Sequence, residues 1–254
     1  MEHEPTRELL EAVRAGKVSV EAAIERLRVE PFTELGFAKL DLHRAVRRGF
    51  PEVVYGPGKT PDEIATLVRT LRDAGQTALV TRVGADVYAV VKRQVPEAVH
   101  HERARAVVAG PERGGPGRPG IVVVTAGTAD RPVAEEAIVT AETMGNSVER
   151  VFDAGVAGLH RLMAHHEALL RARVIVVVAG MEGALPSVVA GLTDCPVVGV
   201  PTSTGYGVGR PGEAALLAML HSCAGGLTVV NVDNGFGAGC AAAMINRIKN
   251  DAAL

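Results

Sequence analysis

Aromatic residues, cysteines and long apolar runs are all scarce in this chain of 254 residues. There is no Trp and aromatics make up only 3% of the sequence, so the core must be built from Val, Ala, Leu and Ile. Three cysteines without metal-ligand or CxxC spacing argue against a disulfide framework and a structural zinc site. No apolar run approaches the roughly 18 residues of a membrane span, and the charged, helical N-terminus is unlike a signal peptide. We therefore expect a cytoplasmic protein that has no membrane partner.

Strong net charge is also missing. The formal charge of −2 gives no basic footprint, which excludes nucleic acid as an expected partner. The length allows one large or two modest domains. The segment richest in glycine and proline is GPERGGPGRPG at residues 110–120, and it is the best linker in the chain. We predict an N-terminal domain over residues 1–118 and a C-terminal domain over residues 119–254.

The N-terminal domain is predicted to be a small α+β unit. Residues 2–30 hold two helical stretches, with Ser19 as the N-cap of the second. Thr60 and Pro61 have the residue types that begin a helix, which we extend to about residue 74. Short strands are predicted around Leu40, Leu42 and residues 53–55, and at residues 77–83, 87–92 and 104–108.

A charged segment, FAKLDLHRAVRRGFPEVVYGPGKT, lies at residues 37–60. One interpretation is a solvated surface with ion pairs. The other is an anionic-ligand site, because Arg forks and Lys point charges suit phosphate and because the charges flank glycine-rich turns. The candidate phosphate-binding or hydrolytic residues are Asp41, Arg44, Arg48 and Lys59.

The C-terminal domain has a regular α/β period. Strands are predicted at residues 121–124, 148–152, 174–179, 196–200 and 227–232, and helices at residues 131–144, 157–171, 184–192, 211–223 and 236–248. Five strands alternating with five helices predict a doubly wound, flavodoxin-like parallel sheet with right-handed crossovers. We expect the strand order 2-1-3-4-5, which is common for five strands.

Ligands of such sheets bind outside the carboxyl ends of the strands. Asp130 either caps the helix after the first strand or belongs to an anion site at that helix N-terminus. The turn is neither GxGxxG nor a Walker loop, so it predicts no standard dinucleotide fingerprint. The candidate substrate-binding residues follow three strands and are Thr125, Ala126, Gly127, Thr128, Asp130, Gly180, Met181, Thr204, Gly205, Tyr206 and Gly207.

Two further residues are candidates for chemistry. Glu182 is a carboxylate directly after a buried strand, and the alternative is a capping or surface acid. Cys223 precedes two glycines that open the backbone to a ligand, and the alternative is a buried small hydrophobe. Both residues are expected to face one cleft with the loop at residues 202–207. The small residues at 235–243 predict a homo-oligomer interface or, alternatively, tight packing within one subunit.

Four C-terminal segments, TAGTAD, AGMEGALPSVVAGL, PVVGVPTSTGYG and LLAMLHSCAGGLTVVNVDNGFGAG, resemble the aminoimidazole-ribonucleotide carboxylase-like superfamily. Within it they are similar to the LarB family, whose own N-terminal motif resembles LGFAKLDLHRAVRRGFPEVVYGPGKT. The resemblance covers almost the whole chain. The purine carboxylases use a His as proton shuttle where this sequence has Ala184, which counts against purine carboxylation.

The resemblance implies that nicotinic acid adenine dinucleotide is carboxylated at pyridinium C5 and cleaved to AMP and pyridinium-3,5-biscarboxylic acid mononucleotide, for nickel-pincer cofactor synthesis. It implies a covalent role for Cys223 and a base or positioning role for Glu182. Carbon dioxide or bicarbonate is the co-substrate, no organic cofactor is expected, and Mg²⁺ suits the diphosphate, although its ligands are unknown. The resemblance also implies a homo-oligomer, with an octamer as the expected form. The alternatives are a purine-type carboxylase and a non-enzymatic nucleotide-binding module.

Overall fold

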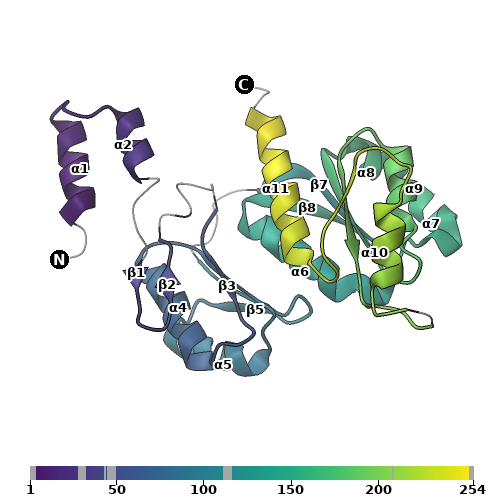
Figure 1. The fold of residues 1–254 in the computed structure, drawn as a ribbon, viewed down its shortest axis with the longest axis horizontal. Coiled ribbons are helices and arrows are strands. Elements are labelled where there is room, and N and C mark those ends of the chain that lie inside the picture. Colours follow the sequence, from purple (N-terminus) through teal and green to yellow (C-terminus); the bar gives the residue numbers. More distant parts are fainter. Residues whose placement is uncertain are drawn as a thin grey trace.

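A computed structural model of the chain describes residues 4–27, 33–42, 44, 50–110, 116–207 and 209–251. Two larger sheets, each with its own helices, follow one another along the chain (Figure 1). They are preceded by α1 (Glu4–Arg14), α2 (Val20–Leu27) and a hairpin of β1 (Thr33–Glu34) and β2 (Lys39–Leu40). The predicted cap of α2 is confirmed, because Ser19 Oγ accepts a hydrogen bond from the backbone N–H of Ala22 at 3.1 Å.

The N-terminal sheet has the order β3-β4-β6-β5. Its strands are β3 (Val53–Tyr55), β4 (Ala78–Thr81), β5 (Val99–His101) and β6 (Ala106–Ala109). β3 and β4 are parallel and are joined by α4 (Pro61–Asp73), whereas β6 pairs antiparallel with β4 and β5. α4 begins as predicted, with a capping box between Thr60 and Glu63.

One predicted element of this sheet is wrong. Residues 87–92 belong to a helix, α5 (Ala85–Gln94), and not to a strand. The β-branched run indicated a strand, but the buried residues of the helix are Val87 and Val91, four apart, which is helical spacing. Gly84 and Asp86 precede the run at the helix N-terminus, where an acid is favourable.

The C-terminal sheet confirms the predicted fold and strand order. All five strands are parallel, in the order β11-β10-β9-β7-β8. If β7 to β11 are counted as strands 1 to 5 of this sheet, the order from the β8 edge is the predicted 2-1-3-4-5. Each strand lies where an apolar run predicted one. The strands are β7 (Arg118–Thr125), β8 (Asn146–Val151), β9 (Val174–Ala179), β10 (Val197–Pro201) and β11 (Leu227–Val229).

Helices cover both faces of this sheet (Figure 1). One face carries α6 (Arg131–Thr143) and α11 (Gly235–Asp251), and the other carries α7 (Leu159–Met163), α8 (His166–Arg171), α9 (Leu185–Leu192) and α10 (Glu213–Leu220). Two predicted helices were too long. The segment 157–171 forms two helices separated by Ala164 and His165, and α10 ends three residues before Cys223.

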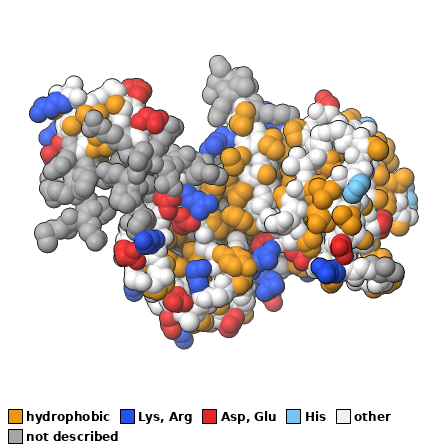
Figure 2. Space-filling model, viewed as in Figure 1, with side chains coloured by type: hydrophobic (Ala, Val, Ile, Leu, Met, Phe, Trp, Pro, Cys, Tyr) orange, Lys and Arg blue, Asp and Glu red, His pale blue; other side chains and the backbone are white. Residues whose placement is uncertain are grey.

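The small residues at the start of α11 pack within the chain. A Cβ added at Gly239 would lie 2.5 Å from the carbonyl oxygen of Ala137 in α6. α11 and α6 therefore approach closely. This contact agrees with the second interpretation of residues 235–243, tight packing within one subunit. Exposed apolar side chains occur elsewhere on this part of the molecule (Figure 2), and they include Leu217 and Leu220 of α10 and Ile248 of α11.

The two parts of the chain are in contact. Leu79 and Ala106 of the N-terminal sheet share an apolar cluster with Val139 of α6, and Phe236 of α11 packs against it. Arg82, directly after β4, donates a hydrogen bond from Nη2 to the carbonyl oxygen of Asp233 at 2.6 Å. None of the described helices combines the length and the apolar character that a membrane crossing requires.

Candidate active site

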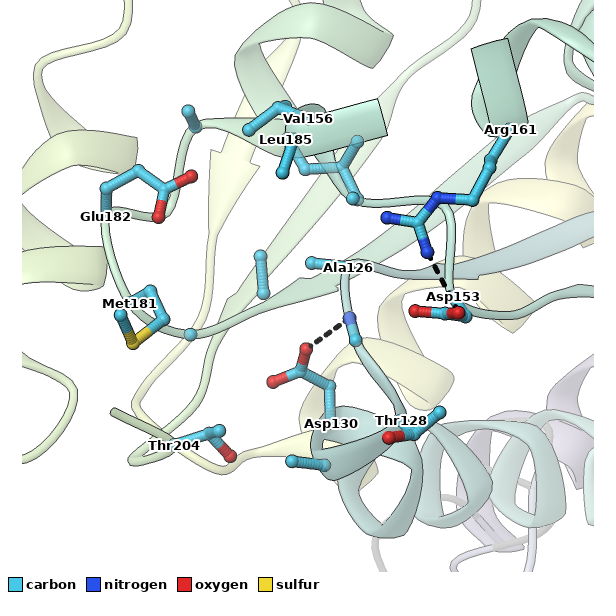
Figure 3. Close-up of a pocket in the computed structure, with 17 residues that line it drawn as sticks. Ala126, Thr128, Asp130, Asp153, Val156, Arg161, Met181, Glu182, Leu185 and Thr204 are labelled. Atoms are coloured by element: carbon cyan, nitrogen blue, oxygen red, sulfur yellow. Dashed lines mark hydrogen bonds and ion pairs between the residues drawn. The ribbon is translucent and has the colours of Figure 1, made fainter. Parts of the chain in front are cut away.

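A cavity of about 400 Å³ lies at the carboxyl ends of β7, β8 and β9, and we call it the Glu182 cavity. In Figure 3, Glu182 and Met181 lie on one side of it, and Asp153 and Arg161 on the other. The parallel strands bring these turns together because their carboxyl ends share one edge of the sheet. The lining residues are Ala126, Gly127, Thr128, Ala129, Asp130, Asp153, Gly155, Val156, Ala157, Arg161, Ala179, Gly180, Met181, Glu182, Ala184, Leu185 and Thr204.

Asp130 is a buried carboxylate in the wall of this cavity. Its Oδ2 accepts a hydrogen bond from the backbone N–H of Gly127 at 2.8 Å, and its Oδ1 accepts one from the Thr202 hydroxyl at 2.7 Å. It occupies the N-cap position of α6 without a side-chain cap hydrogen bond, so the capping alternative for its carboxylate is not met. Burial raises the pKa of Asp130, and the hydrogen bonds that it accepts oppose this rise.

The turn from β9 into α9 is held in a fixed, partly strained conformation. Met181 has a φ of +52°, which a residue other than glycine rarely adopts, and its N–H donates to the carbonyl oxygen of Thr204 at 2.9 Å. Gly180 lies against the backbone of Thr204, where a Cβ has no room. The turn places the exposed Glu182 side chain at the rim of the cavity.

The opposite wall carries an ion pair that we did not predict. Arg161 Nη1 lies 2.8 Å from Asp153 Oδ2 (Figure 3). The backbone N–H of Asp153 donates to Thr125 Oγ1 at 3.0 Å, which fixes this carboxylate beside the end of β7. Asp153 follows β8 at the ligand-binding edge, so its position was a usable signal in the sequence, whereas Arg161 lies in a helix with no such signal.

A second cavity, of about 490 Å³, adjoins the first, and we call it the loop cavity. Met181, Glu182 and Thr204 line both cavities. The loop after β10 forms the rest of its wall, and Gly205 and Gly207 there have positive φ values. The Tyr206 side chain is 90% exposed at the tip of this loop.

Ten of the eleven predicted substrate-binding residues line one or both of these cavities. In the Glu182 cavity they are Ala126, Gly127, Thr128, Asp130, Gly180, Met181 and Thr204, and in the loop cavity Gly205, Tyr206 and Gly207 join Met181 and Thr204. Thr125 is fully buried, and its hydroxyl oxygen is used by Asp153. Their roles in binding remain predictions.

Cys223 is exposed, and the adjacent Ser222 accepts a hydrogen bond from Ser187 of α9 at 2.8 Å. Cys223 does not line the Glu182 cavity or the loop cavity. Gly226, three residues later, accepts a hydrogen bond from the N–H of Val197, the first residue of β10. Cys223 therefore lies toward the amino-terminal edge of the sheet, because α10 runs back against the strand direction. The expectation that one chain brings both residues to one cleft is not met.

The charged segment at residues 37–60 forms its own contacts in the N-terminal part. Arg44 Nη1 pairs with Glu52 Oε1 at 2.7 Å, and Arg44 N donates to the carbonyl oxygen of Asp41 at 3.3 Å. Lys59 Nζ donates to the carbonyl oxygen of Tyr55 at 2.9 Å. None of Asp41, Arg44 and Lys59 lines the Glu182 cavity, and Arg48 lies outside the described residues.

No preformed metal site occurs among the residues that the structure describes. No three His, Cys, Asp or Glu side chains in that part of the chain are grouped to hold a metal ion. Asp130, Asp153 and Glu182 line one cavity without forming such a group.

Two family descriptions match the chain. Residues 32–111 match a LarB/PurE-like N-terminal domain, and residues 120–253 match AIR carboxylase. The chain belongs to the AIR carboxylase family. Within that family it is a LarB-like member, because both matches occur in one chain in this order. The resemblance noted in the sequence is thus confirmed.

One curated relative matches the chain over nearly the full length of both proteins. An uncharacterized protein of Methanocaldococcus jannaschii is 40% identical over 253 residues, which cover 96% of this chain and 98% of the relative. Membership of the family assigns a carboxylase-type, nucleotide-related function to this LarB-like member.

Proposed function

We propose that the protein carboxylates C5 of the pyridinium ring of nicotinic acid adenine dinucleotide and hydrolyses its phosphoanhydride. The products are pyridinium-3,5-biscarboxylic acid mononucleotide and AMP. One observation carries the proposal: a LarB-type N-terminal domain precedes an AIR carboxylase domain in whose cavity Ala184, at the N-cap of α9, stands where the purine carboxylases have a His. Purine carboxylation lacks its proton shuttle there.

The Glu182 cavity has the shape and charge for a cationic ring. Its volume of about 400 Å³ falls within the usual range for small-molecule pockets. The carboxyl groups of Asp130, Asp153 and Glu182 line it, against the single guanidinium of Arg161, so the wall favours a positively charged pyridinium. The N–H groups of Ala126, Gly127 and Asp130 donate within the chain. Those of Thr128 and Ala129, which line the same cavity before α6, suit an attached phosphate.

The reaction requires a pyridinium carbon to become a nucleophile. Addition of the Cys223 thiolate at C4 moves an electron pair into the ring and gives a dihydropyridine with an enamine-like C5. C5 then attacks carbon dioxide, a base removes the C5 proton, and the thiolate leaves as the aromatic ring re-forms. We assign the base to Glu182, whose exposed carboxylate is at the cavity rim.

This chemistry requires Cys223 and Glu182 at one ring. Since Cys223 lines neither the Glu182 cavity nor the loop cavity of its own chain, we propose that a second copy brings its Cys223 to the Glu182 cavity. Exposed Leu217 and Leu220, with 48% and 60% of their surface accessible, precede Cys223 along α10 and offer an apolar contact for that copy. Figure 2 shows apolar side chains gathered on this part of the molecule. The proposed enzyme is accordingly a homo-oligomer.

Phosphoanhydride cleavage requires charge stabilisation on the diphosphate. Mg²⁺ supplies such stabilisation when it is bound to a diphosphate. Asp41, Arg44, Arg48 and Lys59 remain candidates for this step. The co-substrate is carbon dioxide or bicarbonate.

Product analysis by mass tests the proposal. The full chain is incubated with the dinucleotide and isotope-labelled bicarbonate, and in parallel with aminoimidazole ribonucleotide. We expect a labelled biscarboxylic mononucleotide together with AMP, and no labelled ribotide. A labelled ribotide would establish the purine-type activity instead, and bound but unchanged dinucleotide would indicate a nucleotide-binding module.

A further inference from the structure

The turn that carries Cys223 is fixed by a hydrogen bond from another helix. Ser187 lies in the first turn of α9, and its Oγ donates a hydrogen bond to Ser222 Oγ at 2.8 Å. The two serines are 35 residues apart in the sequence, and both are half-buried. The bond therefore ties the segment after α10 to the start of α9.

Ser222 also closes the turn around Cys223. Its Oγ accepts a second hydrogen bond, from the backbone N–H of Ala224 at 3.1 Å. A serine hydroxyl that bonds to the backbone two residues later forms an ST turn, which is a weak motif on its own. Here the hydroxyl is itself held by Ser187. Cys223, the residue between Ser222 and Ala224, is exposed.

The two flanks of this turn are anchored as well. Before it, His221 Nδ1 lies 2.8 Å from the carbonyl oxygen of Leu217, so this nitrogen carries the proton and donates. After it, the carbonyl oxygen of Gly226 accepts from the N–H of Val197 at 3.0 Å. The Ser187 bond holds the stretch between these two anchors, and that stretch includes the thiol.

Ser187 differs from the rest of its helix. The sequence of α9 is LPSVVAGL, so Ser187 is its only polar side chain, and most of the others belong to the apolar core. Alanine has a higher helix propensity and no polar group to satisfy. In the described structure the Ser187 hydroxyl donates to Ser222 and not to a carbonyl oxygen of α9. The role of this serine is accordingly in the turn.

We propose that Ser187 is a positioning residue, which fixes through Ser222 the turn that presents the Cys223 thiol. This role rests on the proposed function, because it concerns catalysis only if Cys223 is the nucleophile. Addition of the thiolate at C4 requires the sulfur in a near-attack geometry, and a displacement of about 1 Å can cost about 10²-fold in rate. Since the bond lies within one chain, Ser187 acts on the thiol that its own copy supplies to the neighbouring Glu182 cavity.

Two measurements on the full chain test this inference: steady-state kinetics with the dinucleotide, and deuterium exchange of the Ala224 amide. In Ser187→Ala we expect kcat to fall at least about ten-fold with KM within about two-fold. The Ala224 amide should exchange about five- to ten-fold faster, because its acceptor loses its support. Thr193→Val is the matched control, since the Thr193 hydroxyl at the other end of α9 donates to the carbonyl oxygen of Val189 at 3.0 Å. It should change neither measurement.

A double variant separates positioning from a general loss of packing. Because Ser187 acts through Ser222, adding Ser187→Ala to Ser222→Ala should cause no further loss of turnover, whereas two independent effects would multiply. Ser187→Thr keeps the hydroxyl and should retain most of the turnover.

Unchanged exchange of the Ala224 amide in Ser187→Ala would overturn the inference whatever reaction the protein catalyses, and so would multiplied losses in the double variant. A wild-type chain that forms no carboxylated product would instead remove the proposed function, and the exchange measurement would still decide whether Ser187 holds the turn. A normal kcat in Ser187→Ala, with product formed by the wild type, would remove the positioning role and keep the function.

Discussion

The Thr202 hydroxyl donates a hydrogen bond to Asp130 Oδ1 at 2.7 Å, and both side chains are buried. Thr202 follows β10 and Asp130 follows β7, so the bond spans β9, which lies between these strands in the sheet. The other carboxylate oxygen of Asp130 accepts from the N–H of Gly127. One carboxylate therefore fixes two of the turns that shape the Glu182 cavity.

Replacement of Thr202 by valine should destabilise the protein by about 1.5–3 kcal/mol, the usual contribution of a hydrogen bond to a charged group. Valine has nearly the same shape but leaves a buried carboxylate oxygen without its donor. The free energy of unfolding, from denaturant titration, measures the effect. Thr202→Ser keeps the hydroxyl and should lose less. A valine variant as stable as the wild type would show that this bond does not hold the two turns.

The raised pKa of Asp130 predicts a pH dependence of stability with a definite sign. Because burial raises this pKa, the folded protein holds the proton more tightly than the unfolded chain does. The contribution of this group to stability is greatest below the unfolded pKa of about 3.9 and is lost as the pH rises to the folded pKa. Asp130→Asn removes the titration. The difference in unfolding free energy, wild type minus variant, should therefore fall over this window, and a rise with pH would contradict it.

Gly180 should not tolerate a side chain. An alanine Cβ there would contact the carbonyl oxygen of Thr204 and lie 2.6 Å from Thr202 Oγ1, so the loop after β10 must move. We expect Gly180→Ala to cost about 1–3 kcal/mol, as overpacking does. Gly191→Ala is the matched control, because nothing lies within 4 Å of an added Cβ in α9, and it should be neutral or stabilising by up to about 1 kcal/mol. Equal stability of the two variants would show that the turn accommodates a methyl group.

Much of this fold was predictable because its signals are local. The strand at Val174–Ala179 is a continuous apolar run that can only be buried on both faces, and the sheet places it at the centre. Ser19 and Thr60 mark helix starts through side-chain hydrogen bonds to their own neighbours. Such features depend on a few adjacent residues, so the sequence carries them.

The errors and omissions have non-local causes. The run at residues 87–92 has β-branched residues typical of a strand, and its helical burial is decided by packing against α4. The pairs Asp153–Arg161 and Arg82–Glu136 join elements whose separation in sequence is unrelated to their contact. The position of Cys223 follows from the direction of α10 relative to the strands, a consequence of topology that residue spacing does not express.

The proposed mechanism makes a prediction about subunits that single variants alone do not test. Cys223→Ala should abolish carboxylation, whereas Cys240→Ala, within α11, should leave it unchanged. Glu182→Gln should lower turnover by about 10²–10⁴, the range for a lost general base, with little change in dinucleotide affinity. Each catalytic variant is therefore expected to be nearly inactive when it is the only chain present.

Mixed oligomers of these two variants distinguish a shared site from one built by a single chain. If the ring lies between Glu182 of one copy and Cys223 of another, random mixing in equal amounts restores about one quarter of the wild-type sites, because half of the copies supply each intact residue. The restored activity should require unfolding and reassembly together, since separately assembled oligomers cannot exchange their residues. If Cys223 instead reached Glu182 of its own chain by a rearrangement of α10, no mixture would regain activity. A flat response across all mixing ratios would therefore refute the shared site, while a maximum at equal amounts would place Cys223 in the neighbouring copy.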